Sequence, residues 1–383
     1  MSVPPIDSES DEKFILQAIA LGQKARINAP PNPWVGCVIV KNRVMIAEGF
    51  TQPVGMPHAE IIALERAGIE AKGSTVYVSL EPCCHTGRTP PCVDALIKAQ
   101  VARVVVAIQD PDPRVNGNGI QRLQQAGLSV TVGVCSKEAQ ESLEPYLWQR
   151  RTGRPFCIAK AVVSIDGRIA AADHTSQWIS CEEARRNSHF LRAESQAILV
   201  GSGTATSDKP FLTVRYQVPQ PINPPLRVVL DSRGSVLPPS PLFDTQLAPT
   251  LIITSEQCPK ATLAIWQATG AVIAILPMAK NGSGIDLEAA LNLLGKRGII
   301  QVLVEGGGVV IDSLIKQNLL NRLIVYVGPR ILGHEGIPLF PHIEVRTIAE
   351  APRLQLSDTH RLGNCVRIDY SLGVGLEAKD MTQ

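Results

Sequence analysis

The chain has 383 residues, too many for one compact core, so two domains are expected. Hydrophobic residues make up 45% and charged residues 19%, as in globular proteins, and a formal net charge of +2 gives no field that would favour nucleic acid or a membrane surface. No apolar run reaches the roughly 18 residues of a membrane span. The polar start "MSVPPIDSESDEK" is unlike a signal or transit peptide, and nine cysteines, an odd number, favour a reducing compartment, the cytoplasm.

The first third of the chain, from Asp11 to about Gly133, alternates between helical and strand patterns. Apolar residues at helical spacing predict helices at 11–25, 58–68, 90–100 and 119–127. Apolar runs rich in β-branched residues predict strands at 34–42, 44–50, 74–82, 102–110 and 128–134. This alternation predicts a layered α/β domain.

A second α/β pattern follows the charged, glycine-containing step "QRRTGRP", which is the predicted boundary between domains 1–152 and 153–383. Strands are expected at 156–167, 196–205, 226–231, 250–255, 270–276, 299–308 and 322–333, and helices at 182–193 and 309–318. The tail after Gly373 is expected to be weakly ordered.

A metal site is predicted from three side chains that lie far apart in the sequence. His58 opens a helix in "HAE", Cys83 follows a strand in "LEPC", and Cys92 opens a helix in "PPC". One imidazole and two thiolates make a three-ligand zinc site whose fourth position stays open for water. Glu60, on the first turn of its helix, can face this water and transfer its proton.

The motif H-x-E followed by P-C-x-x-C is typical of zinc-dependent deaminases. Here "HAE" and "PC" match, but Thr86 replaces the second cysteine, and the next candidate, Cys92, comes nine residues after Cys83. The pattern "HAE…LEPC.H.GRTPPC" resembles the deaminase domain of the bifunctional riboflavin-biosynthesis deaminase/reductases, in which such an insert is normal. The resemblance implies a cytidine-deaminase-like three-layer fold, with His58 and the two cysteines as zinc ligands and Glu60 as proton shuttle. It also implies that the cysteine beside the first ligand, Cys84, points away.

The same resemblance predicts four substrate contacts around the metal. His85 and Arg88 lie in the insert, Asn32 lies between two prolines, and Asp110 lies in "QDPDPRVNGNG". Two of them have a simpler interpretation, because Asn32 could fix a local turn and His85 could be solvent-exposed. Asp112 stands where the family usually has asparagine, and a carboxylate there would repel a nearby phosphate.

The second half carries its own polar groups in apolar surroundings. Lys160 lies within an apolar strand and needs a partner or a function. Glu305 ends a strand and precedes three glycines and a helix, an arrangement that suits a phosphate or a tight turn equally well, and it is not the Rossmann fingerprint. The stretch "VGSGTATSDK" is expected to be a glycine-broken loop that leads to Asp208.

The stretches "SIDGRIA", "SQWIS", "LRA", "VLDS" and "VEGG" recur in the order found in the reductase half of the same family. The resemblance implies a dihydrofolate-reductase-like fold that uses NADPH. It assigns the cofactor to Trp178, Thr204, Asp208, Ser232, Gly307, Gly308, Val309, Val310, Ile311, Asp312 and Ser313. It assigns the substrate to Ser176, Arg192, Leu212, Arg215 and Glu305.

Four positions in this half allow more than one interpretation. Trp178 could be a core aromatic residue, and Arg192 could belong to a solvated helix face. His174 replaces a glycine that is common in the family, and Lys209 could pair with Asp208 or favour the 2′-phosphate of NADPH.

The expected function is a two-step conversion of a pyrimidine ribosyl phosphate. Zinc-assisted hydrolysis would remove the amine at position 2 of 2,5-diamino-6-ribosylamino-4(3H)-pyrimidinone 5′-phosphate. NADPH would then reduce the ribosyl group of the resulting 5-amino-6-(5-phosphoribosylamino)uracil to ribityl. Lys160, Asp208 and Glu305 are the candidates for polar positioning and proton supply. The partners expected are this small molecule and a second copy of the chain, paired through the reductase domain.

Three other hypotheses remain open. A nucleic-acid deaminase would share the zinc chemistry, but it would need a basic surface that carries aromatic residues. This chain has a net charge of only +2, and aromatic residues make up 4% of it. A structural zinc module would need a fourth protein ligand, for which His85 and Cys84 are the nearby candidates. In the third hypothesis only the deaminase half is active and the reductase-like domain is not catalytic.

Overall fold

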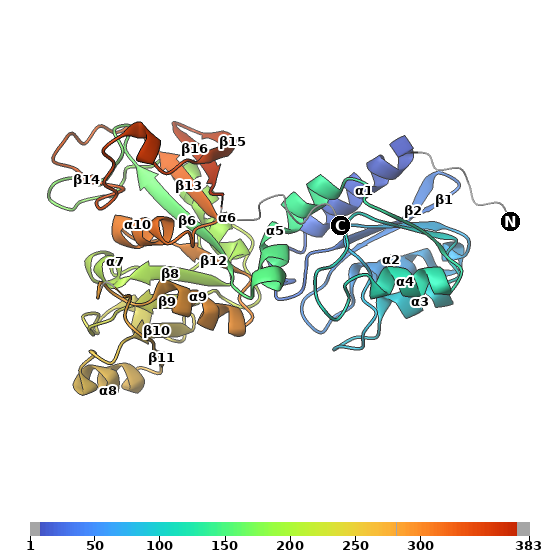
Figure 1. Ribbon diagram of the computed structural model, residues 1–383, viewed down its shortest axis with the longest axis horizontal. Coiled ribbons are helices and arrows are strands. Elements are labelled where there is room, and N and C mark those ends of the chain that lie inside the picture. Colours follow the sequence, from blue (N-terminus) through green and yellow to red (C-terminus); the bar gives the residue numbers. More distant parts are fainter. Residues whose placement is uncertain (1–7, 281, 374–383) are drawn as a thin grey trace. The chain divides into compact units, whose positions relative to one another are not determined.

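The computed structural model describes residues 8–280 and 282–373, so the tail after Gly373 lies outside the described residues. The chain forms two compact units, a first unit of residues 1–153 and a second unit of residues 154–383 (Figure 1). Among the helices of the described residues, none combines the length and apolar character that crossing a membrane requires.

The first unit is a three-layer domain around a five-stranded sheet in the order β2-β1-β3-β4-β5. Its strands are β1 (Gly36–Lys41), β2 (Val44–Phe50), β3 (Thr75–Val78), β4 (Arg103–Val106) and β5 (Ser129–Val132). Its helices are α1 (Ser8–Gln23), α2 (Ala59–Ala67), α3 (Cys92–Lys98), α4 (Asn118–Gln125) and α5 (Ser136–Thr152), with the short 3₁₀ turn η1 (Gly68–Ala71). Helices α1 and α5 cover one face and α2, α3 and α4 the other (Figure 1).

Local sequence explains this arrangement. The β1–β2 hairpin turns at Asn42 and Arg43, whose φ angles of 51° and 63° suit a tight two-residue connection. β3, β4 and β5 are parallel, and β3 and β4 are almost wholly buried, as the apolar runs "TVYV" and "RVVV" predict. Gly36 lets α1 approach the sheet, because a Cβ there would meet the Ala18 carbonyl oxygen at 1.9 Å. Helix α5 was not among the expected helices.

The second unit is built on a nine-stranded sheet in the order β11-β10-β9-β8-β12-β6-β13-β16-β15. The strands from β11 to β13 in this order are parallel, and β16 and β15 extend the sheet in antiparallel fashion. The sheet strands are β6 (Phe156–Val163), β8 (Ala197–Gly201), β9 (Leu226–Leu230), β10 (Thr250–Thr254), β11 (Val272–Ile275), β12 (Gln301–Val304), β13 (Arg322–Val327), β15 (Gln355–Leu362) and β16 (Cys365–Ser371). A small separate sheet pairs β7 (Arg168–Ala170) with β14 (Ile337–Pro338).

The helices of the second unit exceed the two that were expected. They are α6 (Glu182–Glu194), α7 (Ser202–Asp208), α8 (Lys260–Ala268), α9 (Leu287–Lys296) and α10 (Gly308–Lys316), with 3₁₀ turns η2 (Pro241–Phe243) and η3 (Ile348–Glu350). The prediction of a glycine-broken loop leading to Asp208 was wrong, because "SGTATSD" forms α7. Gly201 caps this helix in an extended conformation, and Ala205 packs it into the core.

Strand register brings the polar groups of the second unit together. Val304 of β12 pairs with Ala159 of β6 on one side and with Leu199 of β8 on the other. The next residues along the chain are Glu305, just after β12 ends, and Lys160, inside β6, so these side chains become neighbours on adjacent parallel strands at the carboxyl edge of β12. Ligand sites of open α/β sheets form at this edge.

Candidate active sites

In the first unit, three candidate metal ligands converge from three elements. His58 caps the start of α2, Cys83 follows β3, and Cys92 begins α3. His58 Nδ1 lies 3.6 Å from Cys83 Sγ and 3.4 Å from Cys92 Sγ, and all the ligand atoms lie within 4.8 Å of one another. One imidazole and two thiols are a donor set that zinc takes, so the residues present fit this ion.

The hydrogen-bonding groups around Cys83 favour its metal-binding form. The Cys92 thiol, and more weakly the His58 imidazole, lowers the pKa of Cys83. The Cys92 backbone N–H, at the start of α3, also donates to Cys83 Sγ over 3.3 Å. Thiolates bind metals and thiols do not, and a helix N-terminus favours the thiolate.

The open fourth position distinguishes a catalytic site from a structural one. Among the described residues, no fourth His, Cys, Asp or Glu joins the group. Cys84 turns away and donates to the Arg114 carbonyl oxygen over 3.5 Å. The geometry therefore gives no support to a structural zinc module closed by Cys84 or His85.

Glu60 lies beside the ligands on the first turn of α2 and is almost fully buried. Burial, with a further contribution from the Cys83 charge, raises the pKa of Glu60 to about 6. A carboxyl group whose pKa lies near neutrality can both accept and return a proton.

Glu81, in the "LEPC" motif, organises the loop around the metal ligands, a role that sequence reasoning missed. Its buried carboxylate accepts backbone N–H groups of Asp110, Gly117, Gly119 and Ile120 over 2.8–3.2 Å. These bonds join the end of β3 to the start of α4. A Cβ at Gly119 would lie 2.3 Å from the Pro82 carbonyl oxygen, so the close approach depends on glycine.

Two adjoining cavities contain the predicted substrate contacts of the first unit. Asn32 and His85 line both cavities together with His58 and Cys83, and Arg88 lines the larger, of about 370 Å³. The Nδ1 atom of His85 is buried without a hydrogen-bond partner in the structure. Buried polar atoms are nearly always paired, so an unpaired atom in a cavity wall suits a ligand contact.

Asp110 and Asp112 also line the smaller cavity, and their surroundings shift their pKa values in opposite directions. Asp110 is buried and accepts the Tyr146 hydroxyl, and burial raises its pKa to about 6. Asp112 accepts two bonds from the Arg114 guanidinium, which lowers its pKa to about 2. Arg150 lies 3.4 Å from the same carboxylate. The Asp112 charge that was expected to repel a phosphate is therefore offset by two cations.

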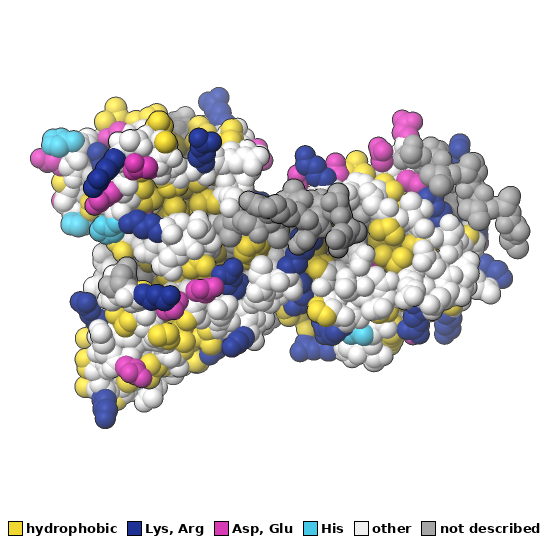
Figure 2. Space-filling model, in the orientation of Figure 1, with side chains coloured by type: hydrophobic (Ala, Val, Ile, Leu, Met, Phe, Trp, Pro, Cys, Tyr) yellow, Lys and Arg dark blue, Asp and Glu magenta, His cyan; other side chains and the backbone are white. Residues whose placement is uncertain are grey.

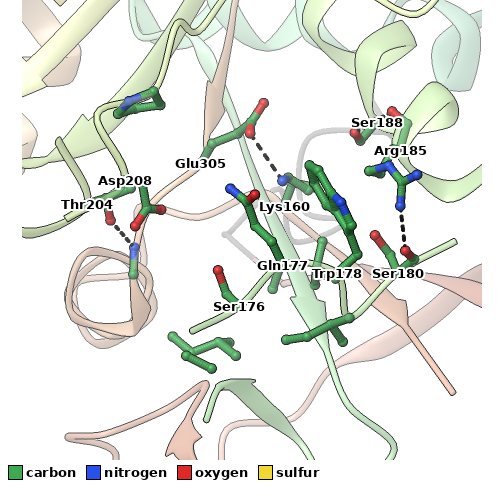
Figure 3. A pocket seen from close by; sticks show the side chains of 18 of the residues that line it. Lys160, Ser176, Gln177, Trp178, Ser180, Arg185, Ser188, Thr204, Asp208 and Glu305 are labelled. Carbon is green, nitrogen blue, oxygen red and sulfur yellow. Dashed lines mark hydrogen bonds and ion pairs between the residues drawn. The ribbon is translucent and has the colours of Figure 1, made fainter. Parts of the chain in front are cut away.

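In the second unit, a buried glutamate lies between two cations. Glu305 receives Arg192 Nε at 2.5 Å and Nη2 at 2.9 Å, and Lys160 Nζ lies 3.1 Å away (Figure 3). Burial alone would raise the pKa of Glu305, but Arg192 and Lys160 outweigh burial and hold it below its ordinary range. Arg192 is buried, so the interpretation of a solvated helix face was wrong.

This ion-pair group belongs to the wall of a cavity of about 580 Å³. Ser176, Trp178, Thr204, Asp208, Leu212 and Arg215 line the same cavity. Trp178 is 56% exposed and stacks under Arg185 at 4.4 Å, so the alternative of a core aromatic residue was wrong. The segment that carries Leu212 has left-handed φ angles at Lys209, Leu212, Tyr216 and Gln217, and such strain is common where backbone is held for function.

A further cavity fits the predicted cofactor contacts. Ser202, Thr204, Ser232, Gly307, Val309, Val310 and Ser313 line it. Thr204 Oγ1 accepts the Gly307 N–H over 2.9 Å just before α10 begins, and a helix N-terminus suits a pyrophosphate. The residues present therefore fit a dinucleotide.

Three of the predicted cofactor residues do not line the described cavities. Gly308 packs against the Leu339 carbonyl oxygen, Ile311 lies in the core, and Asp312 accepts the His342 N–H over 2.7 Å. They lie on the face of α10 that packs into the protein.

Helix α6 presents three further groups to the large cavity that sequence reasoning missed. Arg185, Ser188 and His189 precede the predicted Arg192 at helical spacing, and all four line the cavity. His189 Nδ1 accepts the Arg215 N–H over 2.8 Å, and burial, with the nearby Arg192 charge, lowers the pKa of His189 to about 3. The i, i+3, i+4 pattern was a signal that could have found this face.

Comparison with known proteins identifies a family for each half of the chain. The family model of the cytidine and deoxycytidylate deaminase zinc-binding region matches residues 8–108, and that of the RibD C-terminal domain matches residues 155–368. The class of protein is thus a two-domain enzyme with a zinc-dependent deaminase unit and an NADPH-dependent reductase unit.

The relatives extend over nearly the whole chain. The chain is 46% identical to the riboflavin biosynthesis protein RibD of Chlamydia pneumoniae, over 95% of this chain and 96% of that protein. The structure of Acinetobacter baumannii RibD matches with a TM-score of 0.87 and 34% identity, covering 95% of this chain and 99% of the other. The structure of the deaminase/reductase of Thermotoga maritima matches with a TM-score of 0.83 and 30% identity, covering 96% of this chain and 100% of the other. The chain belongs to the RibD family, the bifunctional deaminase/reductases of riboflavin biosynthesis.

Proposed function

We propose that the first unit deaminates 2,5-diamino-6-ribosylamino-4(3H)-pyrimidinone 5′-phosphate and that the second reduces the product, 5-amino-6-(5-phosphoribosylamino)uracil. The Thermotoga maritima relative carries these two activities in its name. The single observation that supports the first step best is the group of His58, Cys83 and Cys92 with Glu60 beside it. On the face drawn in Figure 2, basic and acidic side chains are interspersed on the second unit, which favours a small molecule over nucleic acid.

In the deaminase site we assign the proton transfers to Glu60. Zinc bound by His58 and the two cysteines supplies a Lewis acid that lowers the pKa of water towards neutrality. Glu60 would take one proton from the attacking water and pass it to the pyrimidine nitrogen, and would then carry the second water proton to the leaving amine, so that ammonia departs. Glu81 is unsuited to this role because four backbone N–H groups occupy its carboxylate. Asn32, His85, Arg88 and Asp110 orient the substrate.

In the reductase site we assign proton supply to Lys160 and charge positioning to Glu305. NADPH, when bound, would supply the hydride for C1′ of the ring-opened sugar, and one proton would complete the amine. Glu305 remains an anion and lies 3.1 Å from Lys160 Nζ, a position that fits Lys160 as the donor. Asp208 lies at the cavity wall with Thr204 and positions cofactor or substrate (Figure 3). Ser176, Leu212, Arg192 and Arg215 hold the substrate, the arginines towards its phosphate.

We also propose a homo-oligomer that pairs through the reductase unit and acts in the cytoplasm. Strand β15 ends the nine-stranded sheet, its residues are almost all exposed, and Leu356 is 57% exposed. An exposed strand edge is a template for pairing with another chain. All nine cysteines are free, as in a reducing compartment. Sedimentation of the wild type and of Thr359→Pro would test the pairing, and a monomeric wild type would refute it.

One assay tests the two reactions. The purified protein with zinc, the diaminopyrimidine phosphate and NADPH should release ammonia first and consume NADPH afterwards. Asp208→Asn should leave ammonia release unchanged and slow the loss of NADPH. Equal damage to both activities would contradict the assignment of Asp208 to the reductase alone.

A further inference from the structure

The deaminase cavities contain two arginines beyond the Arg88 of the motif. Arg114 follows β4 in the loop that Glu81 holds, and Arg150 comes from the last turn of α5. Both line the same two cavities as His58, Cys83 and Asn32. Both lie in stretches quoted from the sequence, "QDPDPRVNGNG" and "QRRTGRP", but neither was a predicted site residue.

The two arginines meet at one buried carboxylate, Asp112. Arg114 donates Nε to Oδ1 over 2.9 Å and Nη2 to Oδ2 over 2.7 Å, and its backbone N–H donates to Oδ1 over 3.0 Å. Arg150 Nε lies 3.4 Å from Oδ2. Asp112 itself is fixed, because its N–H donates to Asp110 Oδ1 over 2.9 Å. The carboxylate thus orients the Arg114 guanidinium through hydrogen bonds, whereas it pairs with Arg150 through charge, and Gln149 and Pro31 accept the Arg150 hydrogen bonds.

The positions of the two guanidinium groups leave them different tasks. The Arg114 side chain is 63% exposed, and its side-chain bonds to Asp112 use Nε and Nη2 and not Nη1. Arg150 is more enclosed: it donates to the Pro31 carbonyl oxygen over 3.3 Å and stacks on the Tyr146 ring at 4.9 Å. Arg114 can therefore touch an anion directly, whereas Arg150 mainly contributes charge.

The larger cavity has a positive wall. Arg88, Arg114 and Arg150 line it, and no Asp or Glu of the described residues does, whereas the acids Glu60, Glu81, Asp110 and Asp112 line the smaller cavity. A guanidinium held in a fixed orientation is a strong partner for a phosphomonoester, because its donors match the phosphate oxygens. A carboxylate that only repelled the phosphate would lack such paired cations.

We propose that Arg114 and Arg150 form the phosphate subsite of the deaminase, with Asp112 as the positioning residue that orients Arg114. This subsite rests on the proposed deaminase function and specifies how that site selects a phosphorylated substrate. Arg114 binds the phosphate oxygens, Arg150 strengthens the local potential, and Asp112 holds the Arg114 guanidinium in one orientation at the cavity wall.

The test compares the phosphorylated pyrimidine with its dephosphorylated counterpart, using the full-length, zinc-loaded protein. Arg114→Gln should raise KM for the phosphorylated substrate about tenfold, the loss of one charge-assisted contact, and leave kcat and the dephosphorylated substrate unchanged. Arg150→Gln should raise the same KM about threefold. Arg114→Lys should recover part of the loss. Arg66→Gln, an exposed arginine bonded to the Glu48 carbonyl oxygen, is the matched control and should change nothing.

Asp112→Asn decides the role of the carboxylate. The proposal expects a KM for the phosphorylated substrate about threefold higher, because the Arg114 guanidinium loses its anchor. A lower KM would mean that Asp112 only repels phosphate, and equal effects of Arg114→Gln on both substrates would mean a structural role; either result overturns the proposal. Zinc content and activity on the dephosphorylated substrate report whether the variants fold.

A second measurement separates this proposal from the proposed reaction. Inorganic phosphate should bind the wild type and bind Arg114→Gln about tenfold more weakly by calorimetry, with Arg88→Gln as a comparison within the cavity. If the wild type released no ammonia but still bound phosphate in this way, the reaction would be wrong and the subsite right. Equal phosphate affinity in wild type and Arg114→Gln would refute the subsite.

Discussion

The two units bury a glutamate in opposite ways. Glu60 lies beside the metal ligands, no lysine or arginine of the described residues is bonded to it, and burial raises its pKa to about 6. The Glu305 side chain is only 8% exposed, but Arg192 and Lys160 hold its pKa below the ordinary range. The first environment makes a carboxyl group that exchanges protons near neutral pH, and the second makes a permanent anion that orients cations. The same side chain therefore has two functions, and its neighbours select between them.

The largest effect should come from removing the proton carrier. Glu60→Gln should slow ammonia release about a thousandfold, because general acid–base catalysis contributes factors of this order. Zinc content should stay at the wild-type level, and so should NADPH consumption when the uracil intermediate is supplied directly. Ammonia release at the normal rate would show that Glu60 is not the proton carrier, so that Glu60 and Glu305 would no longer differ in function as proposed.

Glu305→Gln should affect both stability and chemistry in the second unit. It would leave Lys160 and Arg192 buried without an anion, which costs about 3 kcal/mol of unfolding free energy, and NADPH consumption should fall about a hundredfold. Denaturant unfolding would measure the loss of stability, and steady-state assays would measure the rate of NADPH consumption. Glu288→Gln removes an exposed acid that pairs with Arg154 and should change little, so equal effects of the two variants would contradict the assignment.

A smaller effect is expected at Glu81, whose carboxylate acts through hydrogen bonds alone. In Glu81→Gln only one side-chain oxygen remains to accept the four N–H groups, so the loop that follows β4 should loosen. Unfolding free energy should fall by about 2 kcal/mol and zinc should be lost to chelators about tenfold more readily. Glu65→Gln, on the exposed side of α2, provides the comparison. Unchanged zinc retention would show that the loop holds its shape without this carboxylate.

The smallest effect concerns pH and stability. Burial raises the folded-state pKa of Asp110 to about 6, above its unfolded value, so the folded protein takes up this proton first. The Asp110 contribution to unfolding free energy should therefore increase by about 1–2 kcal/mol as pH falls from 7 to 5. Glu305, with its lowered pKa, should contribute no change in that range. Asp110→Asn should remove this part of the increase, whereas Glu60, whose pKa burial also raises to about 6, keeps its own contribution. A difference between wild type and variant that is constant with pH would refute the Asp110 contribution.

Much of the first site could be predicted because its ligands lie in short motifs. His58, Glu60 and Cys83 lie in the short motifs "HAE" and "LEPC". Cys92 begins a helix, and the two prolines before it indicate where that helix starts. Tyr146 and Arg150 carried no such signal, because they reach the cavity only through the packing of α5, more than fifty residues after the motif. A contact of that kind depends on tertiary structure, which residue types along the chain do not encode locally.

The second unit shows the same limit in its secondary structure. Helix α7 consists largely of Gly, Ser, Thr and Asp, which are weak helix formers, so propensity pointed to a loop. Helix α9 was overlooked although its signals were present: Asp286 accepts the Ala289 N–H as an N-cap, and leucines recur at helical spacing. The Lys160–Glu305–Arg192 group required the strand register, whereas the isolated lysine in an apolar strand had already indicated that some partner exists.

Helix α5 also determines where this protein can be divided. The deaminase family model ends at residue 108, but Asp110, Arg114, Tyr146 and Arg150 all line the deaminase cavity beyond that point. The helix ends at Thr152, followed by Gly153 with a left-handed φ of 72°. A stand-alone deaminase fragment cut at the family-model limit would keep every zinc ligand and lose one wall of its binding cavity, so a working fragment has to retain the chain through α5.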